Sequence, residues 1–445
     1  MQLIDLASAK NVSLLILVGM LVLAGCSAGL VPEQQADAGS SNLTLPTQTP
    51  APLPTPSPIP ESSVRGEVVI WVAYNPIELE GLQRIIDRFA SSNPDIAFAL
   101  AYYQLDELLD AYLTQAPLGR GPTILIGPSE WGPDLYDQGE ILDLGALIDA
   151  DLEQAIYPAA WSQARSDPTV FGLPFELKGV LLFRNRALAP EAPATVANWV
   201  TTMDDLVAEE GNETLLDMSF TYSGGFLPTC GGALESRSDR AQLWGPVGIC
   251  WLELLGELGS AATPVFNSEL DYQAFINGQS PWLIDLAERR PQLQAALGEE
   301  SLAVNPWPVY ANQAMPLRGY TWTENIYIAA GAPSVNLEAA WAFARYLLTP
   351  EAQVIMAESS GAGHIPVIAS AELTDPLMVE SSAMLRSGVP WPLQFTDQEF
   401  LDTLETAVVN VVQQGSNPIF ALNFAQESLG LPITNIPTAT PQGND

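Results

Sequence analysis

The sequence has few basic residues. Its 445 residues include 16 Lys and Arg against 52 Asp and Glu, which gives a formal net charge of -36. A nucleic-acid-binding surface needs clustered basic groups to displace the counterions of the phosphates, so this charge balance excludes DNA and RNA as partners. We interpret the acidity as a means of solubility, and the attraction of a cationic solute is the alternative.

Histidine and cysteine are also scarce, with a single histidine, His364, and three cysteines. Without a cluster of such residues no zinc site is expected, and no Asp-x-Asp-x-Asp-Gly loop indicates calcium. The sequence also lacks a GxSxG elbow, a phosphate loop and a dinucleotide fingerprint. We therefore expect no metal, no cofactor and no enzymatic activity, and we expect His364 to bond to the backbone.

An apolar run near the N-terminus is too short to cross a membrane comfortably. It spans residues 11–22 and is followed by Leu23-Ala24-Gly25-Cys26. This tetrad resembles the lipobox of bacterial lipoproteins, in which the cysteine carries a diacylglycerol and the chain is cut before it. The resemblance implies a signal peptide over residues 1–25, lipidation of Cys26, and export to the outer side of the cell membrane. A short core helix with a chance cysteine is the alternative.

Proline, threonine and serine dominate the next segment. Residues 46–58 alternate proline with threonine and other uncharged residues, a composition that forms no core and favours an extended spacer. We therefore expect residues 26–63 to be a tether between the lipid and a folded part. Residues 432–445 have a similar bias and are predicted to be a flexible tail.

The folded part shows alternating strand and helix patterns. Apolar, β-branched runs predict strands at residues 67–74, 96–102 and 122–127, while helical periodicity marks Leu82 to Phe89 and residues 105–113. This alternation predicts βαβ units and an α/β fold. A chain of this length suits two lobes.

Later segments are less regular. We expect a surface helix with an apolar return over residues 136–147, a kinked crossing strand over residues 171–183, and short strands within residues 302–309. Asn336 is the predicted N-cap of a helix that extends to Leu348. Pro350 suits the first position of the helix that follows.

The order of these segments resembles the family 1 extracellular solute-binding proteins, which include maltose-binding protein and other sugar-binding components of ABC importers. The matching stretches are GEVVIWVAYNPIELEGLQRIIDRF (66–89), GPTILIGPSEWGPDLYDQGEILDL (121–144), FGLPFELKGVLLFRN (171–185), FINGQSPW (275–282), GYTWTENIYIAA (319–330) and residues 337–367. Thr123 stands where the family usually has an aspartate. The segment with Cys230 and Cys250 lies outside the common pattern.

The resemblance implies a two-lobed, periplasmic-binding-protein-like (type II) fold with a ligand cleft between the lobes. Lobe one would comprise residues 64–175 plus 325–363, and lobe two residues 179–320 plus 367–431. The chain would cross near residues 174–179, 318–325 and 361–366. The implied function is capture of a sugar or oligosaccharide by hinge closure and its delivery to an ABC permease, by a monomer.

Ligands of open α/β sheets bind beyond the carboxyl ends of the strands, so we expect the cleft residues there. Aromatic rings would pack on sugar faces, and carboxylates and amides would bond the hydroxyls. The predicted ligand-binding residues are Tyr74, Asn75, Glu78, Glu130, Trp131, Glu176, Tyr222, Trp282, Tyr320, Trp322 and Glu324.

Three questions stay open at this level. Cys230 and Cys250 either pair in an oxidising compartment or remain buried thiols. Arg318 either binds an acidic group of a ligand or fixes the hinge. A glycosidase with Glu130 and Glu176 as its carboxylate pair, or a scaffolding lipoprotein without a small ligand, remains an alternative function.

Overall fold

The computed structural model describes residues 64–232, 234, 237–266, 269–310, 315–359, 363–393 and 398–433. The predicted signal peptide, the lipidated Cys26 and the tether lie outside the described residues, and so does the predicted tail from residue 434 onward. All of the described residues belong to one unit of the fold.

The first part of this unit is the predicted strand–helix alternation. In order come β1 (Gly66–Val72), α1 (Pro76–Ser92), β2 (Ile96–Tyr102), α2 (Leu105–Gln115), η1 (Ala116–Leu118) and β3 (Ile124–Pro128). Strand β1 pairs in parallel with both β2 and β3, so these three strand predictions and both helix predictions are confirmed. The three strands therefore end at one edge of the sheet.

The prediction for residues 136–147 is only partly right. Helix α3 (Trp131–Asp137) ends before Gly139, whose φ of 75° is in the left-handed region that glycine adopts at low cost. Ile141 then forms a bridge with Ala329, which supplies the predicted apolar return. The next elements are η2 (Gly145–Leu147), α4 (Ala150–Ala155), α5 (Pro158–Trp161), β4 (Arg165–Ser166) and β5 (Thr169–Val170).

The long strand β6 (Leu173–Asn185) organises the rest of the sheet. Residues 173–179 pair with β11 (Tyr320–Ile328), while residues 180–185 pair with β9 (Trp282–Leu286) and β10 (Leu302–Asn305). The change of partners falls at Gly179, where a Cβ atom would lie 2.3 Å from the Tyr320 carbonyl oxygen and φ is 151°. The predicted kinked strand is thus one continuous strand that serves two sets of partners.

The three predicted crossing segments lie side by side. Within the described residues the largest sheet has nine strands, in the order β10-β6-β11-β3-β1-β2, with β9 and β12 (Ile365–Pro366) also on β6 and β13 (Val389–Pro390) on β11. Strand β12 pairs with β6 at Glu176 and Leu177, directly opposite the pairing of β6 with β11. The lobe boundaries themselves stay a prediction.

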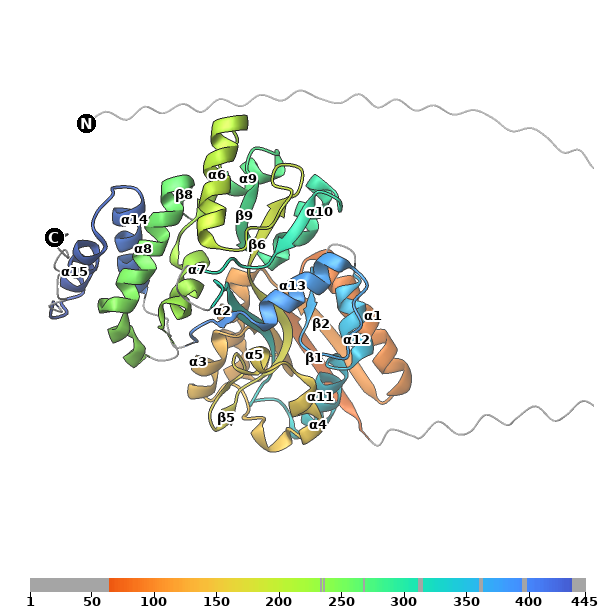
Figure 1. The fold of residues 1–445 in the computed structure, drawn as a ribbon. Helices are drawn as coiled ribbons and strands as arrows, with labels where there is room; N and C mark the ends of the chain where they lie inside the picture. Colours follow the sequence, from red (N-terminus) through yellow and green to blue (C-terminus); the bar gives the residue numbers. More distant parts are fainter. Residues whose placement is uncertain are drawn as a thin grey trace, which may run out of the picture. The chain divides into compact units, whose positions relative to one another are not determined.

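Two groups of helices pack in different parts of the fold. One group contains α11 (Ser334–Leu347), α12 (Pro350–Ala357) and α13 (Pro376–Arg386), and α11 packs on β1 while α12 packs on α1. In the other group, α8 (Pro246–Ala261), α14 (Gln398–Val412) and α15 (Pro418–Ser428) lie side by side (Figure 1). The remaining elements are α6 (Val196–Glu210), β7 (Leu215–Asp217), α7 (Phe220–Ser223), η3 (Gly224–Cys230), η4 (Arg237–Trp244), β8 (Thr263–Val265), α9 (Leu270–Ile276), η5 (Ala287–Arg289) and α10 (Arg290–Leu297).

One helix start differs from the prediction. Helix α11 begins at Ser334 after Pro333, so Asn336 lies inside the first turn. Its side-chain oxygen accepts a hydrogen bond from the Glu67 backbone amide at 3.0 Å, which joins the helix to β1. The restart at Pro350 is confirmed, because Thr349 caps α12 through the Ala352 amide.

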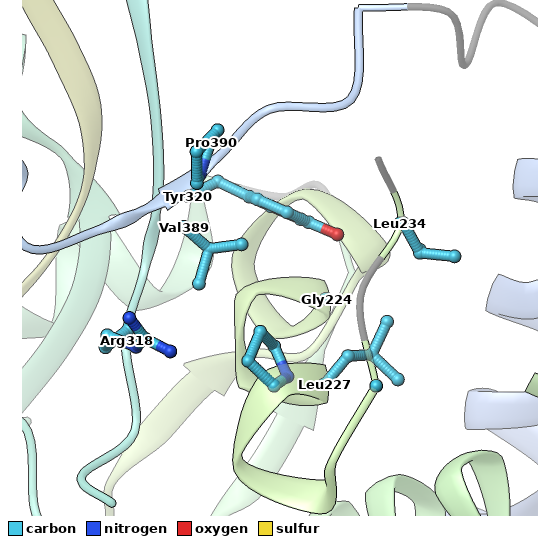
Figure 2. A pocket seen from close by; sticks show the side chains of 9 residues that line it. Gly224, Leu227, Leu234, Arg318, Tyr320, Val389 and Pro390 are labelled. Carbon is cyan, nitrogen blue, oxygen red and sulfur yellow. The ribbon is translucent and has the colours of Figure 1, made fainter. Parts of the chain in front are cut away.

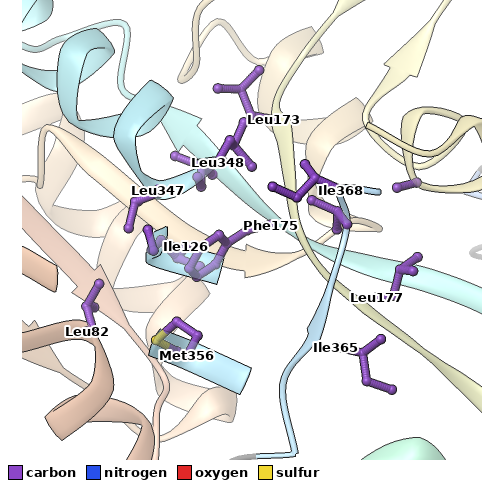
Figure 3. Packing of buried hydrophobic residues seen from close by; sticks show 14 of the residues in the cluster. Leu82, Ile126, Leu173, Phe175, Leu177, Leu347, Leu348, Met356, Ile365 and Ile368 are labelled. Atoms are coloured by element: carbon purple, nitrogen blue, oxygen red, sulfur yellow. The ribbon is translucent and has the colours of Figure 1, made fainter. Parts of the chain in front are cut away.

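Apolar side chains from distant segments form the cores. Leu82 of α1, Ile126 of β3, Phe175 of β6 and Met356 of α12 belong to one buried cluster, which also includes Ile365 (Figure 3). A second cluster packs α6, α8, α14 and α15 around fully buried Trp199 and Trp251. These two cores hold the strands beside which the candidate site lies.

Candidate functional site

A cleft made of two adjoining cavities lies beyond the ends of β1 and β3, beside the middle of β6 and the first half of β11. The cavities have volumes of about 360 and 560 Å³ and share Glu130, Thr221, Trp322 and Trp391. The first is also lined by Ala73, Leu105, Pro128, Ser129, Lys178, Glu288, Thr323 and Glu324. The second is also lined by Ser219, Phe220, Tyr222, Leu286, Pro392, Leu393, Gln398, Leu401, Asp402 and Glu405. Both volumes are in the range usual for small-molecule sites, roughly 300 to 1,000 Å³.

Two tryptophans form an aromatic wall of the cleft. The rings of Trp322 and Trp391 meet edge to face, with centroids 6.1 Å apart. The pairing of β13 with β11 explains this arrangement, because the Trp391 amide donates to the Thr321 carbonyl at 2.8 Å. The Trp391 carbonyl also accepts a hydrogen bond from the Gln163 side chain at 2.9 Å. The position of Trp391 is therefore fixed by hydrogen bonds to its backbone amide and its backbone carbonyl.

Lys178 lies among three carboxylates at the base of the cleft. Its ammonium nitrogen is 3.4 Å from Glu288, 3.7 Å from Glu324 and 3.8 Å from Glu176. The register of β6 on β11 explains the cluster, because Glu176 faces Glu324 and Lys178 faces Trp322 across the ladder. We call Lys178, Glu176, Glu288 and Glu324 the base cluster.

Burial controls the protonation of the base cluster. Burial alone would lower the pKa of Lys178, but Glu176, Glu324 and Glu288 outweigh this effect and hold the pKa well above its usual value. Burial raises the pKa of Glu324, and the charge of Glu176 adds to that rise. Burial also opposes ionisation of Glu176, yet Lys178 and His364 together lower its pKa. Of Glu176 and Glu324, Glu176 is therefore the carboxylate that stays ionised to lower pH.

Four predicted ligand-binding residues line the cleft. Glu130, Trp322 and Glu324 line the first cavity, and Tyr222 lines the second together with Glu130 and Trp322. Glu130 follows β3, at the strand end that the sequence indicated. The structure brings these four residues together in the two adjoining cavities.

Three others lie below or beside the cleft. Glu176 is buried in the base cluster, where its carboxylate is 3.6 Å from the His364 Nδ1 atom. His364 thus faces a carboxylate, whereas the sequence suggested a backbone partner. Tyr74 is also buried, and burial together with the charges of Glu324 and Glu176 raises the pKa of its phenol. Glu78 contacts the backbone of its own helix.

Asn75 and Glu78 form a helix cap. The Asn75 side chain accepts hydrogen bonds from the amides of Ile77 and Glu78, and the Glu78 carboxylate accepts from the Asn75 amide at 2.7 Å. This capping box satisfies amides that the first turn of α1 would otherwise leave unpaired. The Asn75 side-chain oxygen and one carboxylate oxygen of Glu78 are therefore already engaged with the backbone.

Three predicted aromatic residues are not part of the described cleft lining. Trp282 is fully buried, with its ring 6.2 Å from that of Trp199, because its position in β9 turns it into the second core. Trp131 packs onto β3 so closely that a Cβ atom at Gly127 would lie 2.3 Å from its ring. Tyr320 is buried and lines a different cavity. The family resemblance gave the segments of these residues but not the direction of their side chains.

Trp391 was missed, although it forms half of the aromatic wall. It follows the two-residue strand β13, which is too short to give a readable alternation of polar and apolar residues. The only signal was the pair of prolines that flank it in Pro390-Trp391-Pro392. Lys178 had a clearer signal, because it lies in the predicted crossing strand.

Cys230 and Cys250 are joined by a disulfide with a Cα–Cα distance of 5.8 Å. The bond connects the end of η3 to the first turns of α8. It lies outside the lining of the cleft. Its expected contribution is therefore to stability, by closing a loop of 20 residues.

Comparisons with known proteins agree on the kind of protein. A family model described as bacterial extracellular solute-binding protein matches residues 84–384, which is more than half of the chain. A maltotriose-binding protein from Pyrococcus abyssi is 23% identical over 317 residues, covering 70% of this chain and 68% of the relative.

Solved structures have the same fold. A cyclo/maltodextrin-binding protein complexed with maltotetraose aligns with a TM-score of 0.72 at 16% identity, over 83% of this chain and 97% of the other. A cyclic alpha-maltosyl-1,6-maltose binding protein from Arthrobacter globiformis gives a TM-score of 0.71 at 16% identity, over 82% of this chain and 98% of the other. These likenesses confirm the expected two-lobed, periplasmic-binding-protein-like α/β fold. Among the described helices, none is both long and apolar enough to span a membrane.

Proposed function

The chain belongs to the bacterial extracellular solute-binding proteins, and from this premise we propose that it captures a neutral oligosaccharide in the cleft and delivers it to an ABC permease. The observation that carries this proposal is the aromatic wall of Trp322 and Trp391 above the base cluster. Sugar rings present apolar faces to aromatic rings and hydroxyls to carboxylates, and the cleft offers both. The names of the similar proteins, which refer to maltotriose and maltodextrins, support the same class of ligand.

We assign the contacts by position in the cleft. Trp322 and Trp391 would pack on sugar faces, while Glu130 and Glu324 would accept hydrogen bonds from hydroxyls and Lys178 would donate to a sugar oxygen. Tyr222 would contact a further sugar unit in the second cavity. Two adjoining cavities suit a ligand longer than one ring, which favours an oligosaccharide over a monosaccharide.

Charge determines which sugars the cleft would exclude. Of the described residues that line it, Lys178 is the one cation, against the carboxylates of Glu130, Glu288 and Glu324 in the first cavity. Asp402 and Glu405 add two carboxylates to the second cavity. A uronic acid would bring a further negative charge into this surplus, so we expect acidic oligosaccharides to bind more weakly than neutral ones.

Ligand capture would close the protein about the crossing strands. The predicted lobes, residues 64–175 plus 325–363 and residues 179–320 plus 367–431, would rotate about the segments at Gly179 and Glu324, where β6 changes partners and its register on β11 shifts. A ligand that bridges both lobes binds the closed form better and shifts the population toward it. Small-angle scattering of the monomer should show a smaller radius of gyration with ligand, and identical curves would contradict closure.

The site would bind its ligand without converting it. Glu130 and Glu324 would act as hydrogen-bond acceptors. The solute-binding family gives no reason to assign them catalytic roles. Incubation of maltotetraose with the protein should leave the sugar intact by chromatography. Release of shorter sugars would instead favour the glycosidase alternative.

The protein would be exported and held at the cell membrane by a lipid on Cys26. This part of the proposal depends on the Leu23-Ala24-Gly25-Cys26 sequence and on the family, whose members are extracellular. The full chain expressed in a bacterium should enter the membrane fraction and incorporate a labelled fatty acid. Cys26→Ala should abolish the labelling, and labelling that persists in this variant would contradict the anchor.

The ligand class can be tested by a thermal-shift screen of the full chain. Maltotriose and maltotetraose should raise the melting temperature with concentration, whereas glucose and oligogalacturonate should have much smaller effects. Trp322→Ala should weaken the affinity by about tenfold, because one ring face is lost from the contact. Trp341→Ala is the matched control, since Trp341 is also half-buried but lies on α11 outside the cleft. Equal affinities of both variants would contradict the assigned site.

A further inference from the structure

A smaller cavity lies apart from the cleft, beside η3. Its volume is about 190 Å³, and none of its lining residues lines the cleft. The lining residues are Gly224, Leu227, Pro228, Gly232, Leu234, Arg318, Tyr320, Val389 and Pro390 (Figure 2). At about 30 Å³ for each water molecule, the cavity has room for a molecule of several non-hydrogen atoms.

Two hydrogen-bond donors of this lining have no partner among the described residues. The Tyr320 hydroxyl is buried without a hydrogen bond, and the Nε atom of Arg318 is likewise buried and unpaired. Tyr320 itself is only 1% exposed. Buried polar groups are nearly always paired in folded proteins, so two unpaired donors that line one cavity indicate a missing acceptor.

The backbone around the Tyr320 hydroxyl leaves space for that acceptor. A Cβ atom at Gly224 would lie 2.7 Å from the hydroxyl oxygen, so glycine at this position keeps the hydroxyl uncovered. Burial raises the pKa of the phenol, and it therefore remains a proton donor at physiological pH. The guanidinium of Arg318 contributes a fixed positive charge in a protein whose net charge is strongly negative.

The remaining side chains of the cavity are apolar. Leu227, Pro228, Leu234, Val389 and Pro390 supply the apolar wall (Figure 2). No carboxylate or amide side chain is among the described lining residues. A sugar needs acceptors as well as donors for its hydroxyls, so this lining does not suit the ligand of the cleft.

We propose that this cavity is a second binding site, for a small organic acid with a short apolar body. The carboxylate would accept hydrogen bonds from the Arg318 guanidinium and the Tyr320 hydroxyl, and the apolar body would pack on Leu227 and Val389. Guanidinium groups match the planar geometry of carboxylates, and bonds to a charged acceptor are stronger than neutral ones. A bare inorganic oxyanion would leave the apolar wall without a contact.

Tyr320→Phe is the most informative variant. The ring packs edge to face on Trp391 at 4.9 Å and contacts Phe220 at 5.8 Å, and phenylalanine keeps both contacts. Because the hydroxyl has no protein partner, its removal should leave the melting temperature of the ligand-free protein unchanged or higher. Tyr327→Phe is the matched control, since the buried Tyr327 hydroxyl donates to the Pro128 carbonyl at 2.7 Å and its removal should lower the melting temperature.

The binding test uses the full chain in an amine buffer, titrated with butyrate and benzoate by calorimetry at constant ionic strength. Butyramide and benzamide serve as uncharged isosteres, and sulfate as an oxyanion without an apolar body. We expect saturable binding of a carboxylate, little binding of the amides and sulfate, an affinity at least about tenfold weaker in Tyr320→Phe, and none measurable in Arg318→Gln.

Three results would overturn the proposal. The first is the absence of saturable binding of either acid to the folded wild-type protein. The second is binding that both variants retain at wild-type affinity. The third is binding of sulfate or of the amides as tight as that of the acids, since the cavity would then not select a carboxylate with an apolar body.

Discussion

Glu78 connects a helix cap to the charges beneath the cleft, and Glu78→Gln should change how stability depends on pH. Burial raises the pKa of its carboxyl from 4.5 to about 7, and the negative charge of Glu176 adds to this rise. Glutamine can still accept the hydrogen bond from the Asn75 amide that the carboxylate accepts at 2.7 Å. The substitution therefore removes the ionisation while it keeps the capping box.

The direction of the change in stability with pH follows from proton binding by Glu78. Between pH 4.5 and about 7 the folded state holds the Glu78 proton while the unfolded state has lost it, so the wild-type free energy of unfolding falls as pH rises through this window. A shift of this size corresponds to about 3 kcal/mol, an upper limit for a partly accessible group. Glu78→Gln should thus match the wild type at pH 4 and exceed its stability by up to about 3 kcal/mol at pH 8.

Urea unfolding of both proteins from pH 4 to pH 8 measures this difference directly. Asp271 and Asp285, whose pKa values burial raises to about 7 and about 6, titrate in both proteins and cancel in the comparison. Glu107→Gln, in the exposed first turn of α2, is the matched control and should have little effect at either pH. A difference between Glu78→Gln and wild type that stays constant with pH would refute the reasoning.

Three further substitutions test the packing and charges of the fold. Lys178→Met should lower the free energy of unfolding at pH 7 by roughly 3 to 5 kcal/mol, because buried carboxylates lose their counter-charge; an unchanged urea midpoint would contradict this. Replacing both Cys230 and Cys250 by alanine should cost about 3 kcal/mol, measurable by thermal unfolding, and a matching loss on reduction of the wild type would confirm the cause. Trp282→Ala should cost about 3 to 5 kcal/mol through a core cavity, yet leave oligosaccharide affinity unchanged when measured on the folded protein; a selective loss of binding would return Trp282 to the cleft.

The periodic parts of the fold could be predicted from the sequence. Strands such as β1 and β3 are apolar and largely buried, and α1 has its core residues on one face, so local patterns determine both kinds of element. The start of α11 was misplaced because Asn336 suits a cap equally well, and only the tertiary contact with Glu67 shows its role. Short elements such as β13 depend on their partners and leave no local signal.

The sequence predicts which segments reach the site, but not which of their side chains point into it. Glu130 follows β3, Trp322 and Glu324 lie in the first half of β11, and all three line the cleft. Trp282 is a tryptophan like Trp322 and lies in a similar sequence setting. Its place in the alternating pattern of β9, however, directs its side chain into the core. Side-chain direction at a crossing strand depends on register with partners far along the chain, and the sequence does not reveal that register.

The most direct test of the central claim is a calorimetric titration of the full chain with maltotetraose, in parallel with Trp322→Ala. The account predicts saturable binding with one site per chain in the wild type, weakened by about tenfold in the variant. Absence of binding of maltotetraose and maltotriose to folded wild-type protein, or equal binding by the variant, would contradict the claim that this cleft captures an oligosaccharide.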